Sequence, residues 1–202
     1  GHALHVVLTT AEIGSQAGTS VTQDFVETPS QMLENFVYEE KYLKKISRHY
    51  TTGKPLDAST IKKIIANKNF MMATHISRQL LFCFFDFEIH GTKQPKDIVK
   101  VYNDLYKKIT GGTLPKETYF PAGFGHMDGY DSGYYSYLWS LVYAQDIYSK
   151  FQNTTDTQAQ RIGHEYRSKI LEVGSSRKEL DSVTDFLGRK PNTKAFFQSQ
   201  GI

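Results

Sequence analysis

The sequence contains a single cysteine, Cys83, among its 202 residues. One cysteine cannot form an internal disulfide bond, so a disulfide-stabilised secreted scaffold is excluded. Because Cys83 lies in an apolar, aromatic segment, we expect it to be a buried small side chain. The cysteine content favours a reducing compartment.

Long apolar runs and a large charge imbalance are also lacking. The longest apolar runs, such as residues 80–85, are far shorter than the roughly 20 residues that a membrane-spanning helix needs. Residue 1 does not begin a signal peptide, although a targeting segment further upstream is compatible with the sequence. The formal net charge is +3, and basic and acidic residues are interspersed. We therefore expect neither a membrane-spanning segment nor a nucleic-acid partner.

Strand-like alternation over more than a few residues is missing, and so is any internal repeat. Apolar residues recur instead at intervals of three and four, which is typical of amphipathic helices. The fold class is therefore predicted to be mainly α. The predicted helices cover residues 2–13, 22–38, 40–49, 58–68, 70–90, 98–109, 133–151, 157–172, 178–187 and 193–200.

Proline and glycine mark the breaks between these helices. Pro29 conflicts with a helix that starts at residue 22 or 24, so a kink or a later start is expected there. Gly174 and Gly188 are expected as C-terminal caps. A glycine-rich stretch over residues 110–132 has no helical pattern, and such long loops are usually functional or disordered.

Several motifs along the chain together carry a family resemblance. They are Gly1-His2-Ala3-Leu4-His5, residues 24–35, Ser47-Arg48-His49-Tyr50, Phe124-Gly125-His126, residues 134–140 and Phe186-Leu187-Gly188-Arg189. In this order, and over the whole chain, they resemble the thimet oligopeptidase family. The resemblance implies that residues 1–202 are the C-terminal portion of the catalytic domain of a larger, two-lobed helical peptidase of the zincin type, with the N-terminal part absent.

The resemblance also implies one zinc ion and two of its ligands. His2 corresponds to the second histidine of a helical H-E-x-x-H motif, and Glu27 corresponds to the glutamate ligand from the next helix. The first histidine and the general-base glutamate of that motif would precede residue 1. An imidazole nitrogen and a carboxylate oxygen both bind zinc at about 2.0–2.2 Å. Taken singly, a histidine near a terminus and a helical glutamate are more often solvated surface residues.

Polar residues beside these ligands are candidates for a supporting role. Gln31 and Glu34 share one helical face with Glu27, so Glu34 or Gln31 could orient a ligand imidazole through its other nitrogen, and Glu34 is the predicted residue. An exposed helix face would give the same pattern. For His5, three residues after His2, we expect packing or a supporting hydrogen bond rather than metal binding.

The glycine-rich loop supplies the candidate substrate contacts. The resemblance assigns substrate binding and stabilisation of the oxyanion to His126, Tyr130 and Tyr137, and substrate binding to Tyr134 and Gly125. Imidazole and phenol groups can donate hydrogen bonds to a substrate carbonyl, and glycine allows a close backbone approach. Core packing is the alternative for any single tyrosine.

The leading hypothesis is a zinc-dependent oligopeptidase that cleaves internal bonds of short peptides. We expect a monomer in the cytoplasm, with the mitochondrion as the alternative location. The 202 residues alone are predicted to be inactive, because the first histidine and the base would lie upstream. The main rival is a non-catalytic helical peptide-binding or interaction module. A basic nucleic-acid binder, suggested by a pI of 8.8, is a third possibility.

Overall fold

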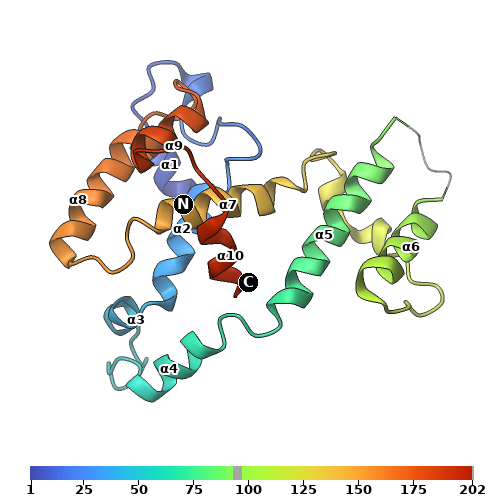
Figure 1. Ribbon diagram of the computed structural model, residues 1–202, viewed down its shortest axis with the longest axis horizontal. Coiled ribbons are helices and arrows are strands. Elements are labelled where there is room, and N and C mark those ends of the chain that lie inside the picture. The colour runs from blue at the N-terminus through green and yellow to red at the C-terminus, as the bar shows by residue number, and fades with distance from the viewer. Residues whose placement is uncertain (93–96, 202) are drawn as a thin grey trace. The chain divides into compact units, whose positions relative to one another are not determined.

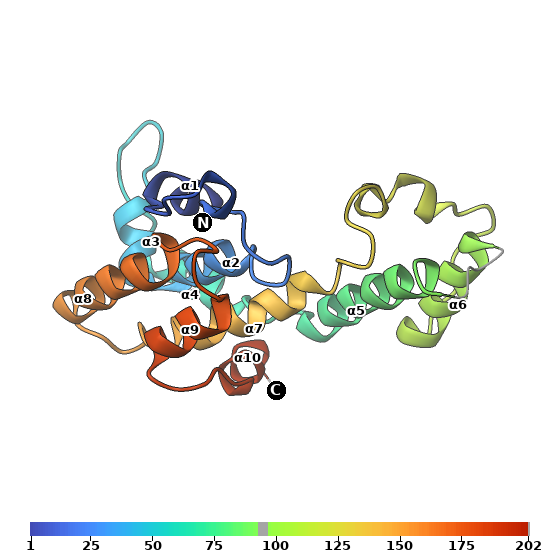
Figure 2. The same ribbon diagram turned by 90° about the horizontal axis from the view of Figure 1, so that it is seen from above.

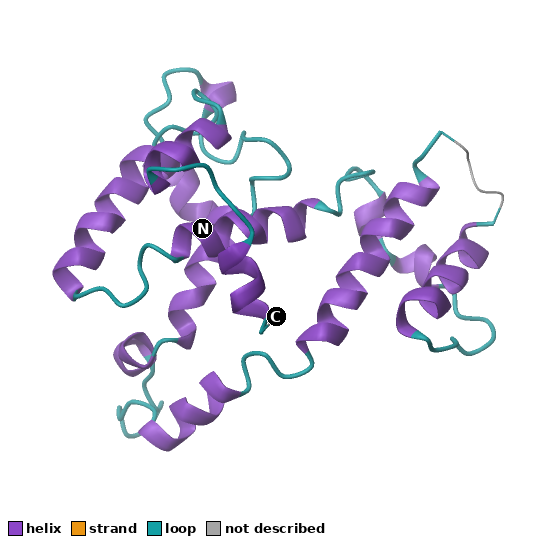
Figure 3. Ribbon diagram, in the orientation of Figure 1, coloured by secondary structure: helices purple, strands orange, loops and turns teal. Residues whose placement is uncertain are grey.

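Helices account for all of the regular secondary structure in the residues that the structure describes. A computed structural model describes residues 1–92 and 97–201, and within these ranges it contains ten α-helices and no strand (Figure 3). The mainly α fold class is therefore confirmed. None of the helices in these ranges is long and apolar enough to cross a membrane.

The chain forms two compact units. The first consists of Gly1–Phe70 together with Trp139–Ile202, and the second consists of Met71–Leu138. Because the second unit is inserted into the first along the sequence, the division does not follow a simple N-terminal and C-terminal split. Helix α7 (Ser136–Tyr148) begins in the second unit and ends in the first.

The first unit has its core where α7 meets helices that precede it and helices that follow it in the sequence. Its buried residues include Met32, Ile147, Ile162, Ile170 and Phe186. Figure 2 shows α8 (Asp156–Tyr166) and α9 (Glu179–Leu187) in orange and red. The remaining helices of this unit are α1 (His2–Leu8), α2 (Thr28–Glu34), α3 (Glu40–Ile46), α4 (Ala58–Ala66), α8 (Asp156–Tyr166), α9 (Glu179–Leu187) and α10 (Lys194–Gln200).

The second unit is built on two adjacent helices, α5 (Met72–Ile89) and α6 (Ile98–Thr110) (Figure 1). Their buried faces contribute Leu81, Phe85 and Tyr102 to a separate core. Cys83 is 7% exposed, as the sequence predicts. The glycine-rich stretch after α6 contains two short 3₁₀ helices, Phe120–Gly123 and Gly125–Met127.

Several helices begin or end at other residues than the sequence indicates, among them α1 and α2. Helix α1 ends at Leu8 rather than residue 13, because the chain turns into an extended conformation and the backbone N–H of Thr10 donates to Glu172 O at 2.8 Å. Helix α2 begins at Thr28, which confirms the later start. Pro29 then lies in the first turn, where its missing N–H costs no helical hydrogen bond.

The two predicted glycine caps differ in role. Gly188 adopts φ +71° directly after α9, and its N–H donates to Thr184 O, so this cap is confirmed. Gly174 also has a positive φ of +53°, but the π-helical turn before it ends at Leu171, so the cap prediction is wrong. Gly174 is instead required where the backbone of Gln16 passes, because a Cβ atom would lie 2.1 Å from Gln16 O.

Candidate metal ligands and substrate loop

His2 and Glu27 lie close together in the first unit. His2 is the first residue of α1, and Glu27 directly precedes α2. His2 Nε2 lies 3.8 Å from Glu27 Oε1. Two ligands that bind one zinc ion with bonds of about 2.0–2.2 Å can be at most about 4.3 Å apart, so this spacing fits a shared ion.

A glycine allows the two helices to approach each other here. A Cβ atom on Gly1 would lie 2.1 Å from the backbone nitrogen of Ser30, which no side chain could tolerate without movement. The close approach brings the start of α1 against the first turn of α2. The position of His2 beside Glu27 therefore depends on Gly1.

Ser30 holds the other side of the His2 ring. Its Oγ lies 2.8 Å from His2 Nδ1 and also accepts a hydrogen bond from the backbone N–H of His2 at 3.2 Å. A histidine that binds a metal through Nε2 carries its hydrogen on Nδ1, where Ser30 Oγ can accept it. The sequence analysis did not select Ser30. Its position three residues after Glu27, on the same helical face, is the signal that could have identified it.

Glu34 and His5, the other two polar candidates near this pair, differ in burial. Glu34 is exposed, and partial desolvation followed by the charge of Glu27 raises its pKa. His5 is fully buried, and neither ring nitrogen has a hydrogen-bond partner among the described residues. Burial and then the charge of His2 lower the pKa of His5. The His2 hydrogen bond thus comes from Ser30, while His5 packs as a neutral ring.

His2 and Glu27 are not accompanied by a third candidate ligand in the described part of the chain. Within residues 1–92 and 97–201, no group of three histidine, cysteine, aspartate or glutamate side chains is arranged to hold a metal ion. The pair can therefore supply two ligands of a site and no more.

The second unit brings the candidate loop residues together. His126 Nε2 lies 2.7 Å from the hydroxyl oxygen of Tyr137. The His126 ring also contacts Tyr134 edge-on at 5.2 Å between centroids and Tyr130 at 5.6 Å. Tyr130 is 55% exposed. One histidine thus contacts all three candidate tyrosines.

Tyr134 differs from the other two tyrosines. It is 8% exposed, and its hydroxyl donates to Gln79 Oε1 at 3.1 Å. Burial raises the pKa of Tyr134 to about 12, with a smaller contribution from Tyr137. Its phenol therefore remains protonated at neutral pH and anchors the loop to α5.

The glycines of the loop have separate roles. Gly129 adopts φ +90°, a conformation that favours glycine. Gly125 has no positive φ, and a Cβ atom there would meet nothing within 4 Å. The backbone conformation therefore favours glycine at position 129, whereas the described fold leaves room for a side chain at position 125.

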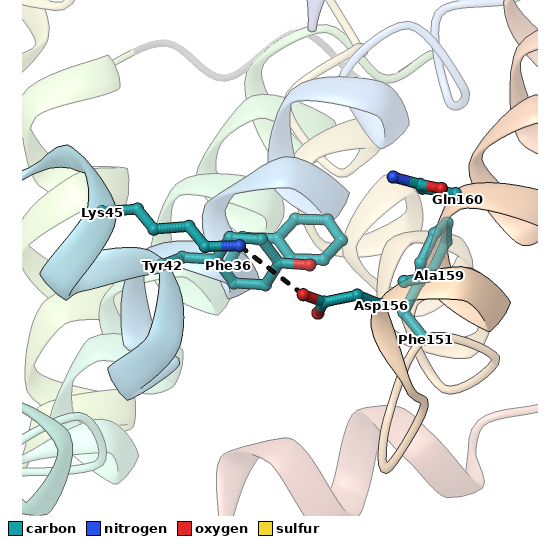
Figure 4. Close-up of a pocket in the computed structure, with 7 residues that line it drawn as sticks. All are labelled: Phe36, Tyr42, Lys45, Phe151, Asp156, Ala159 and Gln160. Carbon is teal, nitrogen blue, oxygen red and sulfur yellow. Dashed lines mark ion pairs between the residues drawn. The ribbon is translucent and has the colours of Figure 1, made fainter.

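A pocket in the first unit contains none of the predicted site residues (Figure 4). Three aromatic rings, those of Phe36, Tyr42 and Phe151, line it. Lys45 Nζ and Asp156 Oδ2 form an ion pair of 3.8 Å at this pocket. Its lining is thus aromatic with one charged pair.

Comparison with known proteins identifies the family. The whole chain, residues 1–202, matches the family described as Peptidase family M3. It is 38% identical over 208 residues to oligopeptidase A of Salmonella typhimurium and 37% identical over 212 residues to saccharolysin of Saccharomyces cerevisiae. These matches cover 100% of this chain but 30% and 29% of the relatives, so the chain spans about a third of their length. The chain belongs to peptidase family M3.

Proposed function

We propose that this chain supplies two metal ligands and the substrate loop of a zinc-dependent oligopeptidase that hydrolyses internal bonds of short peptides. The observation that carries the proposal is the 3.8 Å spacing of His2 Nε2 and Glu27 Oε1, with Ser30 on the other ring nitrogen. Membership of peptidase family M3 and the similarity to oligopeptidase A and saccharolysin support the reaction class.

His2 and Glu27 would hold the zinc ion. When bound, zinc lowers the pKa of a coordinated water to about 7 and polarises a carbonyl oxygen. Ser30 would keep the imidazole of His2 in the tautomer that presents Nε2 to the metal. The charge of Glu34 interacts with that of Glu27. Glu34 would help to orient a ligand imidazole from the same side of α2.

The loop would act on the substrate carbonyl. As a peptide bond is hydrolysed, its carbonyl oxygen gains negative charge, and a phenol hydroxyl can donate a hydrogen bond to it. Tyr137 would be that donor, and His126 would orient its hydroxyl from 2.7 Å. The exposed Tyr130 would contact the peptide, and Gly125 and Tyr134 would complete its binding surface.

The 202 residues by themselves should not catalyse the reaction. With two candidate ligands and no general base assigned among them, we expect weak zinc binding and no hydrolysis. For the natural protein we propose a monomer that works on short peptides without nucleic acid or membrane. A cytoplasmic location is proposed, although the similar proteins of Arabidopsis thaliana include both cytosolic and organellar forms.

A non-catalytic peptide-binding module is the second candidate. The observation in its favour is that no three candidate ligands meet in residues 1–92 and 97–201. Such a module would bind peptides through the loop of the second unit and hydrolyse nothing. It would bind the same peptides with and without a chelator.

The test uses the natural protein that contains this chain. Zinc content and hydrolysis of a quenched fluorescent peptide are measured before and after a chelator, for the wild type and for Glu27→Gln. We expect the variant to lose zinc and activity, and a matched change at the exposed Glu12, Glu12→Gln, to lose neither. Full activity after complete metal removal would overturn the proposal, and peptide binding without hydrolysis would favour the module.

A further inference from the structure

A buried carboxylate in the second unit faces the substrate loop. Asp86, on α5, is 0% exposed. Its Oδ1 accepts a hydrogen bond from the backbone N–H of Ser132 at 2.9 Å, and its Oδ2 accepts one from the backbone N–H of Tyr134 at 2.8 Å. Buried charged groups are costly unless they are hydrogen-bonded, so these contacts are needed for Asp86 to occupy this position.

His90 provides the third contact. It lies one helical turn after Asp86, and its Nδ1 is 2.7 Å from Asp86 Oδ1. Its side chain is 25% exposed, so the buried carboxylate is linked to the protein surface through this ring. Asp86 is thereby held by His90, which directly follows α5, and by the backbone of the loop.

The loop backbone has a left-handed conformation at Ser132, whose N–H donates to Asp86. Ser132 adopts φ +57°, a conformation that is unfavourable for a residue with a Cβ atom. Backbone N–H groups near a left-handed residue form a concave site that binds an anion, and here the anion is the Asp86 carboxylate. The carboxylate therefore stabilises a conformation that the sequence at Ser132 does not favour.

The held segment leads directly to the reactive pair. Tyr134 follows Ser132 by two residues, and its ring contacts His126 edge-on at 5.2 Å. Its carbonyl oxygen accepts the backbone N–H of Tyr137 at 3.4 Å as α7 begins. The position of the Tyr137 hydroxyl beside His126 is thus set by the turn that Asp86 fixes.

We propose that Asp86 is a positioning residue for the His126–Tyr137 pair and acts on the reaction only through it. This inference rests on the proposed function. In Asp86→Asn, the amide offers one acceptor oxygen, and its NH₂ group faces the second backbone N–H. The turn should relax, the pair should move, and turnover should fall by about 10- to 100-fold, since a misplacement of about 1 Å can cost about 100-fold.

A double-mutant cycle with Tyr137→Phe tests this in the natural protein. If Asp86 acts through Tyr137, Asp86→Asn should reduce kcat strongly in the wild type and less than about threefold in Tyr137→Phe. Equal losses in both backgrounds would overturn the inference while leaving the proposed function intact. If Tyr137→Phe alone leaves kcat unchanged, the proposed function itself fails.

Two further variants separate positioning from loss of folding. Asp146 is a matched buried carboxylate in the first unit that accepts from Arg189 and from the backbone N–H of Asn192. If Asp146→Asn lowers the melting temperature as much as Asp86→Asn does, it should still keep the kcat of the wild type. A loss of kcat equal to that of Asp86→Asn would overturn the inference. If Asp86→Asn does not fold, His90→Gln replaces it in the cycle, with an expected loss of about three- to tenfold. An unchanged kcat in a folded His90→Gln variant would then overturn the inference that Asp86 positions the pair.

Discussion

His126 Nε2 lies 2.7 Å from the hydroxyl oxygen of Tyr137, so one hydrogen bond joins the glycine-rich loop to the first turn of α7. Both rings also contact Tyr134, whose hydroxyl is committed to Gln79. Tyr137 thus has a fixed position beside His126 and Tyr134. This arrangement is what a donor to a developing negative charge requires, because little reorganisation is needed as the charge forms.

Tyr137→Phe should lower kcat of the natural protein by about 10²–10³ with a small change in KM, because one oxyanion donor is lost. Steady-state hydrolysis of a quenched fluorescent peptide measures both constants. The exposed Tyr119 in the same unit is the matched control, and Tyr119→Phe should behave as wild type. A variant with unchanged turnover would show that Tyr137 has no such role.

Ser30→Ala should weaken zinc binding by about 10- to 100-fold, which is typical when the hydrogen-bond partner of a ligand histidine is removed. The reason is that Ser30 Oγ contacts both Nδ1 and the backbone N–H of His2. Competition with a chelator of known affinity provides the measurement. Ser20→Ala removes a hydroxyl from an exposed serine of the same unit and should not alter affinity. Equal affinities of the two variants would contradict the role of Ser30.

Gly174→Ala should reduce the free energy of unfolding by about 2–4 kcal/mol, because a positive φ and a steric conflict add together. The new Cβ atom would lie 2.1 Å from Gln16 O. Gly188→Ala is the control, since Gly188 has a similar φ of +71° but open space around its Cβ position. It should lose about 1 kcal/mol. Urea denaturation of both variants gives the comparison, and equal losses would exclude the steric contribution.

Acidification should destabilise the fold through His5. Its pKa is lowered in the folded state, mainly by burial and then by the charge of His2, whereas the nearby Glu179 opposes the shift. The unfolded chain therefore takes up the proton first. Stability is fully present above pH 6.5, the usual histidine value, and is lost as the pH falls below it, with a slope of up to about 1.4 kcal/mol per pH unit.

The measurement for His5 is the free energy of unfolding at pH 7.5 and pH 5.5. His5→Leu should flatten the dependence between the two values, because the leucine cannot take up a proton. His164→Gln, a change at an exposed histidine of α8, should leave the dependence as in the wild type. A dependence that survives His5→Leu would assign the effect to other groups.

Much of the helical fold could be predicted from local patterns. Helix α6 shows apolar residues at Ile98, Tyr102, Leu105 and Ile109, and the structure gives Ile98–Thr110. Pro29 predicted either a kink or a late start of α2, and the structure has the late start. The early end of α1 could not be predicted locally, because it depends on a hydrogen bond from Thr10 to Glu172, a residue 162 positions away.

The sequence by itself determined the helical class and the order of the family motifs, and the family resemblance implied the candidate residues His2, Glu27, His126 and Tyr137. The helical class depends on side-chain type and spacing over one or two helical turns, which are local properties. Only the tertiary structure decided which residues hold the candidates in place. Ser30 is 28 positions from His2, and Asp86 is 46 positions from Ser132. A hydrogen bond across such separations forms only after the helices have packed, because packing brings the donor and acceptor within about 3 Å.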